Sequence, residues 1–585
     1  MSTVEGIGAA PGRALGRVHR LEAEAAPVPH RTIAPEEVEA EVRRFEQARA
    51  AARERLEALK TETGDRFGPY DAGMFEAQML MVDDPMIEEG TLAYIRENYL
   101  AAERAFDLQM LEHRVRLLDS GKTMEIDRLS DLHDVRHRVL STLLDLPEPE
   151  IPEGDEPLIL VARDLPPSLA ARLDAARVVG FVTERGSRAG HSVLIAKSLG
   201  IPAVVGVTAA LEALPHGCRA LIDGRTGRIV CDPDEPEIEA FRRGVVRLEA
   251  RRERLVEASP ERPTRTADEV EVTIQANVDR PDEVARARTL GAAGVGLFRS
   301  EFLVIGHREI PSEAEQYEAY RMAVEAFPDC EVVLRTFDLG GDKFPMFLEM
   351  PREENPYLGW RAIRVCLDLP DLFLNQLRAA VRASAHGDLK ILIPFVTSVD
   401  EIERTRALIG RVYDELGEAA PAGRVPLGIM VETPAAVELL DRIAPHVDFV
   451  SLGTNDLTQY VLAVDRGNAK LAAVFEPLHP ALLAQYRRIV RACRTHDLPV
   501  GVCGELAGDP VGLAVLIGLG FRRFSISLST LTEQREVARG VVAAELRKLV
   551  DGADWEDGAA CRAEVAAYLE DRGVFEGDAA RLSGE

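Results

Sequence analysis

The sequence predicts a multidomain α/β protein whose C-terminal half is a closed (β/α)8 barrel. From about residue 265 onward, short apolar runs alternate with helical stretches. The runs are EVTIQANV, GVGLFRS, EVVLRTFD, LKILIPFV, VPLGIMVE, VDFVSLGT, PVGVCGE and RRFSIS. Buried parallel strands read as continuous apolar runs, and eight βα units over about 300 residues are typical of this barrel. An open doubly wound sheet is the alternative, which the count of eight disfavours.

Two different patterns precede the barrel. In the first, apolar residues such as Val38, Val42 and Phe45 share one helical stripe, which predicts a helical hairpin or bundle. In the second, strand-like runs such as PLILVA and RVVGFVT alternate with a helical run and predict a compact α/β unit. An acidic DPDEPE segment then leads into a connecting helix. The predicted boundaries are 1–24 with 146–232 for the α/β domain, 25–145 for the inserted helices, 233–262 for the linker, 263–573 for the barrel and 574–585 for a tail.

Composition and charge exclude several classes of protein. A net charge of −28 argues against a nucleic-acid partner, and its simplest meaning is a solvated acidic surface. No apolar run approaches the ~18 residues of a membrane helix, and the N-terminus lacks the pattern of a signal peptide. The seven cysteines are scattered without CxxC pairs, which argues against a disulfide framework or a structural zinc site. We therefore expect a cytoplasmic protein.

Polar residues stand where the apolar runs of the barrel end. These residues are Arg299, Arg335, Glu432, Asn455, Asp456 and Cys503, and Arg361 and Arg466 follow the third and sixth runs. Because a barrel of this kind brings the carboxyl ends of its strands to one mouth, we expect these side chains to converge.

The residue types indicate the chemistry of that mouth. Several arginines indicate a multiply charged anion, since guanidinium groups match phosphate and carboxylate geometry. The two acids, Glu432 and Asp456, suit Mg²⁺, which prefers a few carboxylates completed by substrate oxygens. A single arginine would more often pair with a surface acid. Three arginines at strand ends beside two acids favour a binding site instead.

A second candidate site lies in the phrase GSRAGHSVLIAKSLG, which contains His191. The histidine follows a Gly/Ser-rich turn and directly precedes a helical run, a place that suits phosphate because of the free N–H groups and the positive end of a helix. A neutral imidazole is also a competent nucleophile near pH 7. An isolated histidine is more often a surface or capping residue, so the interpretation depends on the whole phrase.

Several long phrases resemble those of enzyme I of the bacterial phosphoenolpyruvate-dependent sugar phosphotransferase system, a member of the phosphoenolpyruvate-utilising enzymes. They stand in the family's order and cover essentially the whole chain: GIGAAPGRALG, GAAGVGLFRSEF, LRTFDLGGDK, ENPYLGWRAIR, GIMVETPAA, SLGTNDLTQYVLAVDRGN and VCGELAGD. The resemblance implies a helical domain inserted into a phosphohistidine α/β domain, a linker helix and a barrel that forms a homodimer.

The resemblance also implies a role for each candidate residue. His191 would accept the phosphoryl group of phosphoenolpyruvate and pass it to the carrier protein HPr, with release of pyruvate. Glu432 and Asp456 would coordinate Mg²⁺. Cys503 would protonate the enolate, which fits a thiol that keeps its proton at neutral pH, although alone it would read as a small buried apolar residue. The residues that would hold phosphoenolpyruvate are Arg299, Arg335, Arg361, Asn455, Asp456 and Arg466.

The segment YDAGMFEAQMLMVDDPM (70–86) resembles the family's docking helix for HPr. Its methionine-rich cluster consists of Met74, Phe75, Met79, Leu80 and Met81. Such faces suit transient partners, and packing in the helical core is the competing interpretation.

The sequence departs from the family around the histidine. Ala189 and Gly190 replace a Thr-Ser pair, Lys197 replaces an arginine, and Pro166 replaces a threonine that lies near the histidine in the family. Hydroxyl groups that would orient the imidazole are therefore missing. A loop after the second barrel run also differs, at Gly306-His307-Arg308.

These departures keep alternative functions open. A regulatory phosphorelay protein with weak or altered transfer is one, and identifying its HPr-like acceptor would distinguish it. Phosphoenolpyruvate synthase and pyruvate phosphate dikinase share the histidine and barrel units, but both need an ATP-grasp domain that is larger than the inserted helices. A non-catalytic scaffold conflicts with the full set of barrel residues.

Overall fold

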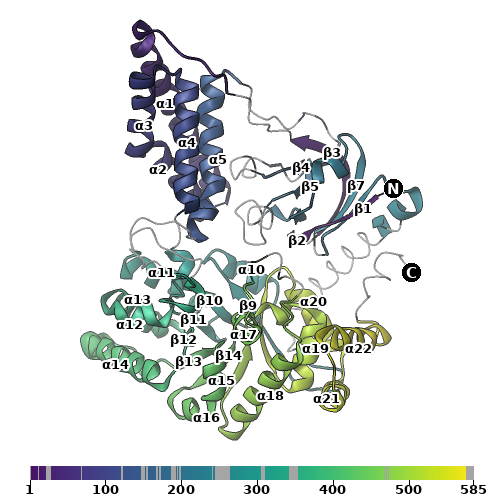
Figure 1. The fold of residues 1–585 in the computed structure, drawn as a ribbon. Helices are drawn as coiled ribbons and strands as arrows, with labels where there is room; N and C mark the ends of the chain where they lie inside the picture. Colours follow the sequence, from purple (N-terminus) through teal and green to yellow (C-terminus); the bar gives the residue numbers. More distant parts are fainter. Residues whose placement is uncertain are drawn as a thin grey trace. The chain divides into compact units, whose positions relative to one another are not determined.

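The computed structural model of the chain consists of two compact units, Met1–Arg242 and Arg243–Glu585 (Figure 1). Their boundary falls within the predicted linker, most of which lies outside the described residues together with the tail after residue 574. The structure describes residues 2–10, 12–21, 28–67, 69–119, 123–146, 152, 154, 156–165, 169, 173–174, 176–185, 193, 196, 199–224, 226–239, 241–243, 264–304, 310–340, 353–466, 468, 471 and 474–574. Within these residues, no helix is both long and apolar enough to cross a bilayer.

The N-terminal unit contains an eight-stranded sheet in the order β1-β8-β7-β3-β4-β5-β6-β2. Strands β3, β4, β5 and β6 are parallel to one another, and the remaining pairs are antiparallel. The bounds are β1 (Ser2–Glu5), β2 (Ile7–Ala10), β3 (Arg13–Leu21), β4 (Leu158–Ala162), β5 (Val178–Thr183), β6 (Ala203–Val205), β7 (Arg219–Asp223) and β8 (Arg228–Cys231), with the short helix α8 (Ala210–Ala213) between β6 and β7. The predicted α/β unit is therefore confirmed.

The helical stripe seen in the sequence is the core side of a bundle (Figure 1). Its helices are α1 (Val38–Phe67), α2 (Pro69–Val82), α3 (Pro85–Asn98), α4 (Ala102–Asp119) and α5 (Thr123–Leu143). Val42 and Phe45 of α1 pack with Phe106 of α4 in one apolar cluster. The buried carboxylate of Glu41 accepts hydrogen bonds from Arg44 at 2.8 Å and from the backbone N–H of Ala102 at 2.8 Å, which ties α1 to the start of α4.

The structure corrects the docking prediction for two residues of α2. Phe75 and Met79 are 0% and 6% exposed and belong to the bundle core, so they present no surface to a partner. The sequence could not separate these possibilities, because α2 is apolar on most of its circumference and shows no dominant face. Leu80 and Met81 are half-buried, and the side chain of Met74 lies outside what the structure describes.

The C-terminal unit is the predicted closed barrel, with parallel strands in the order β9 to β16 and with β16 closing onto β9. All eight apolar runs form strands: β9 (Thr273–Val278), β10 (Val295–Arg299), β11 (Val332–Arg335), β12 (Leu389–Ile393), β13 (Leu427–Val431), β14 (Phe449–Leu452), β15 (Val500–Val502) and β16 (Arg523–Ser527). Alternate side chains on these strands face the barrel interior, where Leu297, Val333, Leu392, Met430, Phe449 and Cys503 form one cluster.

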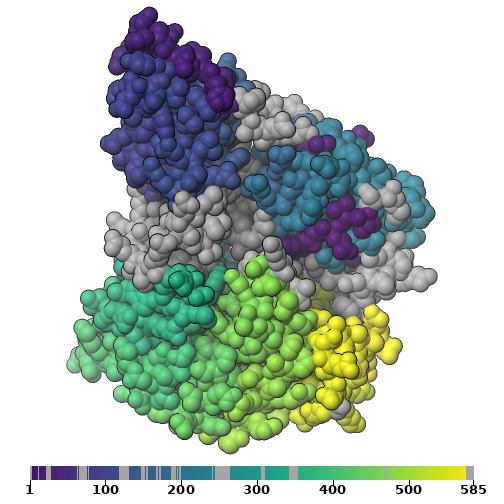
Figure 2. All heavy atoms as spheres, viewed as in Figure 1, coloured from purple at the N-terminus to yellow at the C-terminus, as the bar shows by residue number. Residues whose placement is uncertain are grey.

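Helices cover the outside of the barrel and form the teal-to-yellow surface of this unit (Figure 2). They are α10 (Glu283–Thr289), α11 (Glu313–Ala326), α12 (Ile363–Asp368), α13 (Pro370–Ala383), α14 (Val399–Leu416), α15 (Pro434–Glu438), α16 (Leu440–Ile443), α17 (Thr454–Leu462), α18 (Pro480–Thr495), α19 (Pro510–Leu519), α20 (Leu531–Gly540), α21 (Ala543–Gly552) and α22 (Gly558–Asp571). Local sequence fixes several of their starts. Ser312 with Glu315 and Ser398 with Glu401 form capping boxes at α11 and α14.

An ion cluster closes the N-terminal end of the barrel. The carboxylate of Glu331, next to the start of β11, accepts hydrogen bonds from Lys390 of β12 at 2.5 Å and Arg523 of β16 at 2.7 Å. Gln275 of β9 donates a third at 2.8 Å. Burial alone would raise the pKa of Glu331, but Lys390 and Arg523 outweigh it and lower the pKa. One carboxylate therefore links residues from strands on both sides of β11.

We predict that Glu331→Gln lowers the free energy of barrel unfolding by about 1–3 kcal/mol at pH 7, since it leaves two half-buried cations without their counter-charge. Urea unfolding followed by tryptophan fluorescence measures this directly, because both tryptophans, Trp360 and Trp555, lie in the C-terminal unit. A carboxylate with a lowered pKa stabilises the fold above its unfolded-state pKa and loses that effect as the pH falls through its folded pKa. The wild type and the variant should therefore converge in acid.

The matched control is Glu415→Gln, which removes an exposed carboxylate that also pairs with two cations, Arg378 and Arg411. This change should leave the unfolding midpoint unchanged, since exposed ion pairs contribute little. Equal losses in the two variants would contradict the role given to Glu331.

Candidate active site

The structure brings the predicted polar residues to the carboxyl ends of the barrel strands. Arg299 ends β10, Arg335 ends β11, and Glu432 directly follows β13. Asn455 and Asp456 lie in the first turn of α17 after β14, and Cys503 directly follows β15. Because all these strands are parallel in one closed barrel, their carboxyl ends share one mouth.

Arg335 is held by carboxylates from two sides. Its guanidinium forms an ion pair with Glu301 and lies 3.4 Å from the carboxylate of Asp338. Burial would lower the pKa of Arg335, but Glu301 and Asp338 outweigh it and raise the pKa. The arginine therefore keeps its charge in a site where only 6% of its side chain is exposed.

The backbone around Arg335 is fixed by a buried hydrogen-bond relay. The hydroxyl of Ser300 donates to the carbonyl of Arg335 at 2.6 Å and accepts from Gln376 at 2.9 Å. The Gln376 carbonyl in turn accepts the N–H of Phe337 at 3.0 Å. The relay couples the ends of β10 and β11 to helix α13, so it positions both arginines that end these strands.

Arg361 is the most enclosed cation of the mouth, with 2% of its side chain exposed. It lies 2.9 Å from Asp338 and 3.7 Å from Asp456, and its guanidinium lies over the ring of Phe395 at 4.7 Å. Gly340 makes this approach possible, because a Cβ at that residue would lie 2.4 Å from the Cβ of Arg361. The φ of +114° at Gly340 also favours glycine.

Arg299 and Arg466 are the more accessible cations. Arg299 pairs with Asp279 at 3.1 Å, and Asp279 raises the pKa of that guanidinium. Arg466 lies 3.9 Å from Asp456. Their side chains are 28% and 29% exposed, against 6% for Arg335 and 2% for Arg361.

Glu432 is almost completely buried and accepts the N–H of Phe395 at 2.7 Å. Burial, together with the charges of Asp456 and Asp338, raises its pKa to about 8. Ionising Glu432 is therefore costly in this site unless a positive charge lies beside it. The remaining groups of the cluster are the cations Arg299, Arg335, Arg361 and Arg466 and the acids Asp279, Glu301, Asp338 and Asp456.

The thiol of Cys503 lies at the top of the apolar barrel interior and is 3% exposed. It donates a hydrogen bond to the carbonyl of Leu452 at 3.6 Å. Burial raises the pKa of Cys503 to about 11, and the Glu432 carboxyl adds to that shift. This thiol therefore keeps its proton at neutral pH and is an acid, not a nucleophile, in this environment.

The loops after β14 and β15 are joined at the mouth. The side-chain carbonyl of Asn455 accepts the backbone N–H of Glu505 at 3.1 Å. Gly504 allows the close contact, because a Cβ there would lie 1.8 Å from the hydroxyl of Thr454. Asn455, Asp456 and Cys503 are thereby held in a fixed mutual arrangement.

The histidine site cannot be placed in the same way. His191 lies outside the described residues. So do the departures near it, Pro166, Ala189, Gly190 and Lys197, and the altered barrel loop, Gly306-His307-Arg308. The roles assigned to these residues stay predictions.

The sequence prediction missed several residues of the mouth. Glu301 is the ion-pair partner of Arg335, Asp279 is that of Arg299, and the hydroxyl of Tyr460 accepts a hydrogen bond from Arg361 at 3.1 Å. Glu301 had one available signal, a charged residue two positions after a strand-end arginine. Asp279 likewise follows the first apolar run directly. Tyr460 lies within a helix and gave no such signal.

Comparison with known proteins identifies relatives for nearly the whole chain. Residues 5–124 match the N-terminal domain of PEP-utilising enzymes, residues 154–227 the mobile domain and residues 253–542 the PEP-binding domain. The chain is 37% identical to a phosphoenolpyruvate-protein phosphotransferase of Geobacillus stearothermophilus, over 94% of this chain and 93% of that protein. Proteins of the same description from Bacillus sp. (strain S) and Haloferax volcanii are 38% and 39% identical, over 91% and 90% of this chain and 92% and 91% of theirs.

We predict that Asp338→Asn destabilises the barrel by about 3 kcal/mol, because removing one partner of a buried ion pair leaves an uncompensated charge. Asp338 is 2% exposed and neutralises both Arg335 and Arg361, and asparagine keeps its shape. Urea unfolding followed by tryptophan fluorescence gives the measurement.

Asp279→Asn is the matched control, since its carboxylate also pairs with a strand-end arginine but is 38% exposed. Its loss should stay below about 1 kcal/mol. A control that is as destabilised as Asp338→Asn would show that burial does not govern these pairs.

Proposed function

The chain belongs to the family of PEP-utilising enzymes and is a phosphoenolpyruvate-protein phosphotransferase, enzyme I of the phosphotransferase system, and we propose that its barrel mouth holds phosphoenolpyruvate while His191 receives the phosphoryl group. The observation that carries this proposal is the paired arginine cluster beside a protonated thiol at one barrel mouth. Phosphoryl transfer depends mainly on positioning and on neutralising negative charge, which this arrangement supplies.

The arginines would act as a preorganised anion site. Arg335 and Arg361 are already fixed by Glu301 and Asp338, so little reordering is needed when the substrate enters. Arg299 and Arg466, which are more exposed, would contact the phosphate and carboxylate oxygens that reach the opening, with Asn455 as a further polar contact. The exposed arginines would thus bind the substrate, and the fixed arginines would stabilise the transition state.

Glu432 and Asp456 fit the hard cation Mg²⁺. In a buried site, each carboxylate makes ionisation of the other less favourable, and this effect contributes to the pKa of about 8 at Glu432. A divalent cation bound between the two groups would remove that repulsion. When bound, Mg²⁺ would neutralise charge on the phosphate and carboxylate oxygens of the substrate. Tyr460 and Phe395 enclose Arg361 beside these acids and would help to exclude water.

Cys503 would complete the first half-reaction. Transfer of the phosphoryl group to an imidazole nitrogen of His191 breaks the P–O bond and leaves the enolate of pyruvate. The Cys503 thiol carries its proton at neutral pH and would donate it to the enolate carbon. The charges of Arg335 and Arg299 act on the same thiol and would stabilise the thiolate that remains.

The second half-reaction would pass the phosphoryl group from His191 to a histidine of HPr, in the cytoplasm. Leu80 and Met81, which are half-buried on α2, remain candidates for the docking surface, and Met74 stays a prediction from the sequence. A homodimer formed through the barrel follows from the same family resemblance.

The first test is the intact mass of the chain after mixing with phosphoenolpyruvate and Mg²⁺. We expect a gain of one acid-labile phosphoryl group, which His191→Ala abolishes and which transfers to HPr when that protein is added. His216→Ala is the matched control, because His216 is an exposed histidine of the same unit, and it should keep the gain. A folded wild-type chain that gains no phosphoryl group would mean that the changed residues around His191 have removed the transfer step.

A second test concerns the proton donor. We predict that Cys503→Ala retains binding of Mg²⁺ and phosphoenolpyruvate but lowers the rate of pyruvate formation by about 100-fold or more, the usual contribution of a positioned general acid. Single-turnover measurement of pyruvate gives the rate. Cys493→Ala, which removes another buried barrel thiol, should leave that rate unchanged. Normal pyruvate formation by Cys503→Ala would contradict the assignment.

A further inference from the structure

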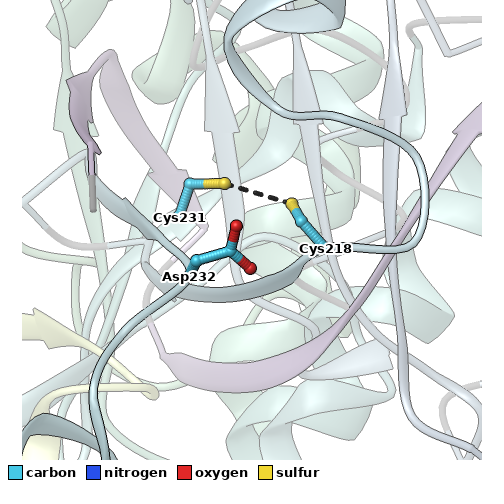
Figure 3. Close-up of side chains that lie close together, drawn as sticks. All are labelled: Cys218, Cys231 and Asp232. Atoms are coloured by element: carbon cyan, nitrogen blue, oxygen red, sulfur yellow. Dashed lines mark hydrogen bonds between the residues drawn. The ribbon is translucent and has the colours of Figure 1, made fainter.

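Two thiols meet at one end of the β7–β8 hairpin in the N-terminal unit. Cys218 directly precedes β7 and Cys231 is the last residue of β8. Their sulfur atoms lie 3.1 Å apart, and Figure 3 shows the two side chains directed toward each other beside the carboxylate of Asp232. All seven cysteines lie within the described residues, and this is the one thiol–thiol hydrogen bond among them.

The backbone sets this approach. Cys231 pairs with Ala220 in the antiparallel ladder, so Cys218 lies diagonally across the hairpin on the same side of the sheet. The carbonyl of Cys218 accepts the N–H of Val18 in β3 at 2.8 Å. On the other strand, Asp232 donates its N–H to the carbonyl of Arg219 at 2.8 Å. Both cysteines are therefore anchored by main-chain hydrogen bonds, and their proximity does not depend on side-chain rotation alone.

The surroundings allow access from one side. Cys231 is 4% exposed and packs within the apolar cluster that includes Val18 and Ile222, whereas Cys218 is half-buried at its edge. Cys218 is therefore the more accessible of the two cysteines.

The spacing distinguishes two possible roles for the pair. With Asp232, the cysteines offer three ligand atoms that a soft metal ion could use. Thiolates on a tetrahedral zinc ion lie about 3.8 Å apart, as follows from Zn–S bonds of about 2.3 Å. The observed 3.1 Å is shorter than that, and only about 1 Å of further approach gives the length of an S–S bond. The spacing therefore favours covalent joining over metal binding.

We propose that Cys218 and Cys231 form a reversible intramolecular disulfide on exposure to a low-molecular-weight disulfide. In the first step the Cys218 thiolate attacks one sulfur of the small disulfide and expels one small thiolate, which leaves a mixed disulfide. The Cys231 thiolate then attacks the Cys218 sulfur and expels the second. The protein loses two electrons and two protons, and the small disulfide is reduced to two thiols.

The chemistry of the pair predicts slow exchange. Burial raises the pKa of Cys218 to about 12, and the hydrogen bond with Cys231 contributes to that rise. Little of Cys218 is thiolate at neutral pH, so its oxidation depends on the close spacing and not on a reactive sulfur. Such a bond acts as a structural staple of the hairpin, and this inference does not rest on the proposed phosphoryl transfer.

The test uses the full chain with oxidised glutathione, followed by intact mass and peptide mapping. We expect the loss of two hydrogen atoms and a peptide pair that links Cys218 to Cys231. Cys218→Ser and Cys231→Ser should each abolish the linked peptide, whereas Cys330→Ser, a half-buried cysteine of the barrel, should keep it. A stable mixed disulfide with glutathione and no linked peptide would overturn the proposal.

Stability provides a second readout that needs no variant. Closing a loop between residues thirteen positions apart should raise the melting temperature of the N-terminal unit by about 5–10 °C in scanning calorimetry, and dithiothreitol should reverse the shift. The barrel transition, followed by tryptophan fluorescence, should not move. The proposal would be wrong if oxidation gave no linked peptide and the reduced chain bound one Zn²⁺ ion that required both cysteines and Asp232. The pair would then be a metal site.

Discussion

The site depends on keeping buried arginines charged and paired with carboxylates. Arg335 and Arg361 are almost fully enclosed, and a guanidinium in such a place is tolerated only beside carboxylates at hydrogen-bond distance. Asp338 forms ion pairs with both arginines, and Glu301 forms a second ion pair with Arg335. This constraint explains why the mouth contains acids as well as arginines. The acids fix the positions of the guanidinium groups that we propose hold the substrate.

The barrel satisfies this constraint because it brings distant parts of the chain to one place with rigid backbones. Arg335 at the end of β11 pairs with Glu301, which follows β10. Arg361 lies near Asp338, which follows β11, and near Asp456 of α17, although these residues are far apart in sequence. The Ser300–Gln376 relay transmits the rigidity of an outer helix to the strand ends. Gly340 and Gly504 lie so close to Arg361 and Thr454 that no side chain would fit at either glycine, which allows the neighbouring loops to pack closely. Preorganisation here is a property of the packing around the mouth.

Much of this was predictable from sequence, and the limits have physical causes. The eight apolar runs became eight strands because continuous apolar segments of this length fit buried parallel sheets. The strand-end arginines and acids converged because the fold class fixes where strands end. Glu301 and Asp279 were missed because an ion-pair partner is chosen by three-dimensional proximity, which no local pattern encodes. For Phe75 and Met79, the sequence could not decide between docking and core packing, because α2 is apolar on most of its circumference.

Burial raises the pKa of a thiol in each unit, but the two thiols have different neighbours. At the barrel mouth burial raises the pKa of Cys503, so that thiol keeps its proton at neutral pH. In the β7–β8 hairpin it raises the pKa of Cys218 as well, but there a second sulfur lies 3.1 Å away. We propose that Cys503, beside the substrate site, acts as an acid. We propose that Cys218, beside Cys231, forms a disulfide bond. The neighbour, and not the acidity, therefore determines what each cysteine can do.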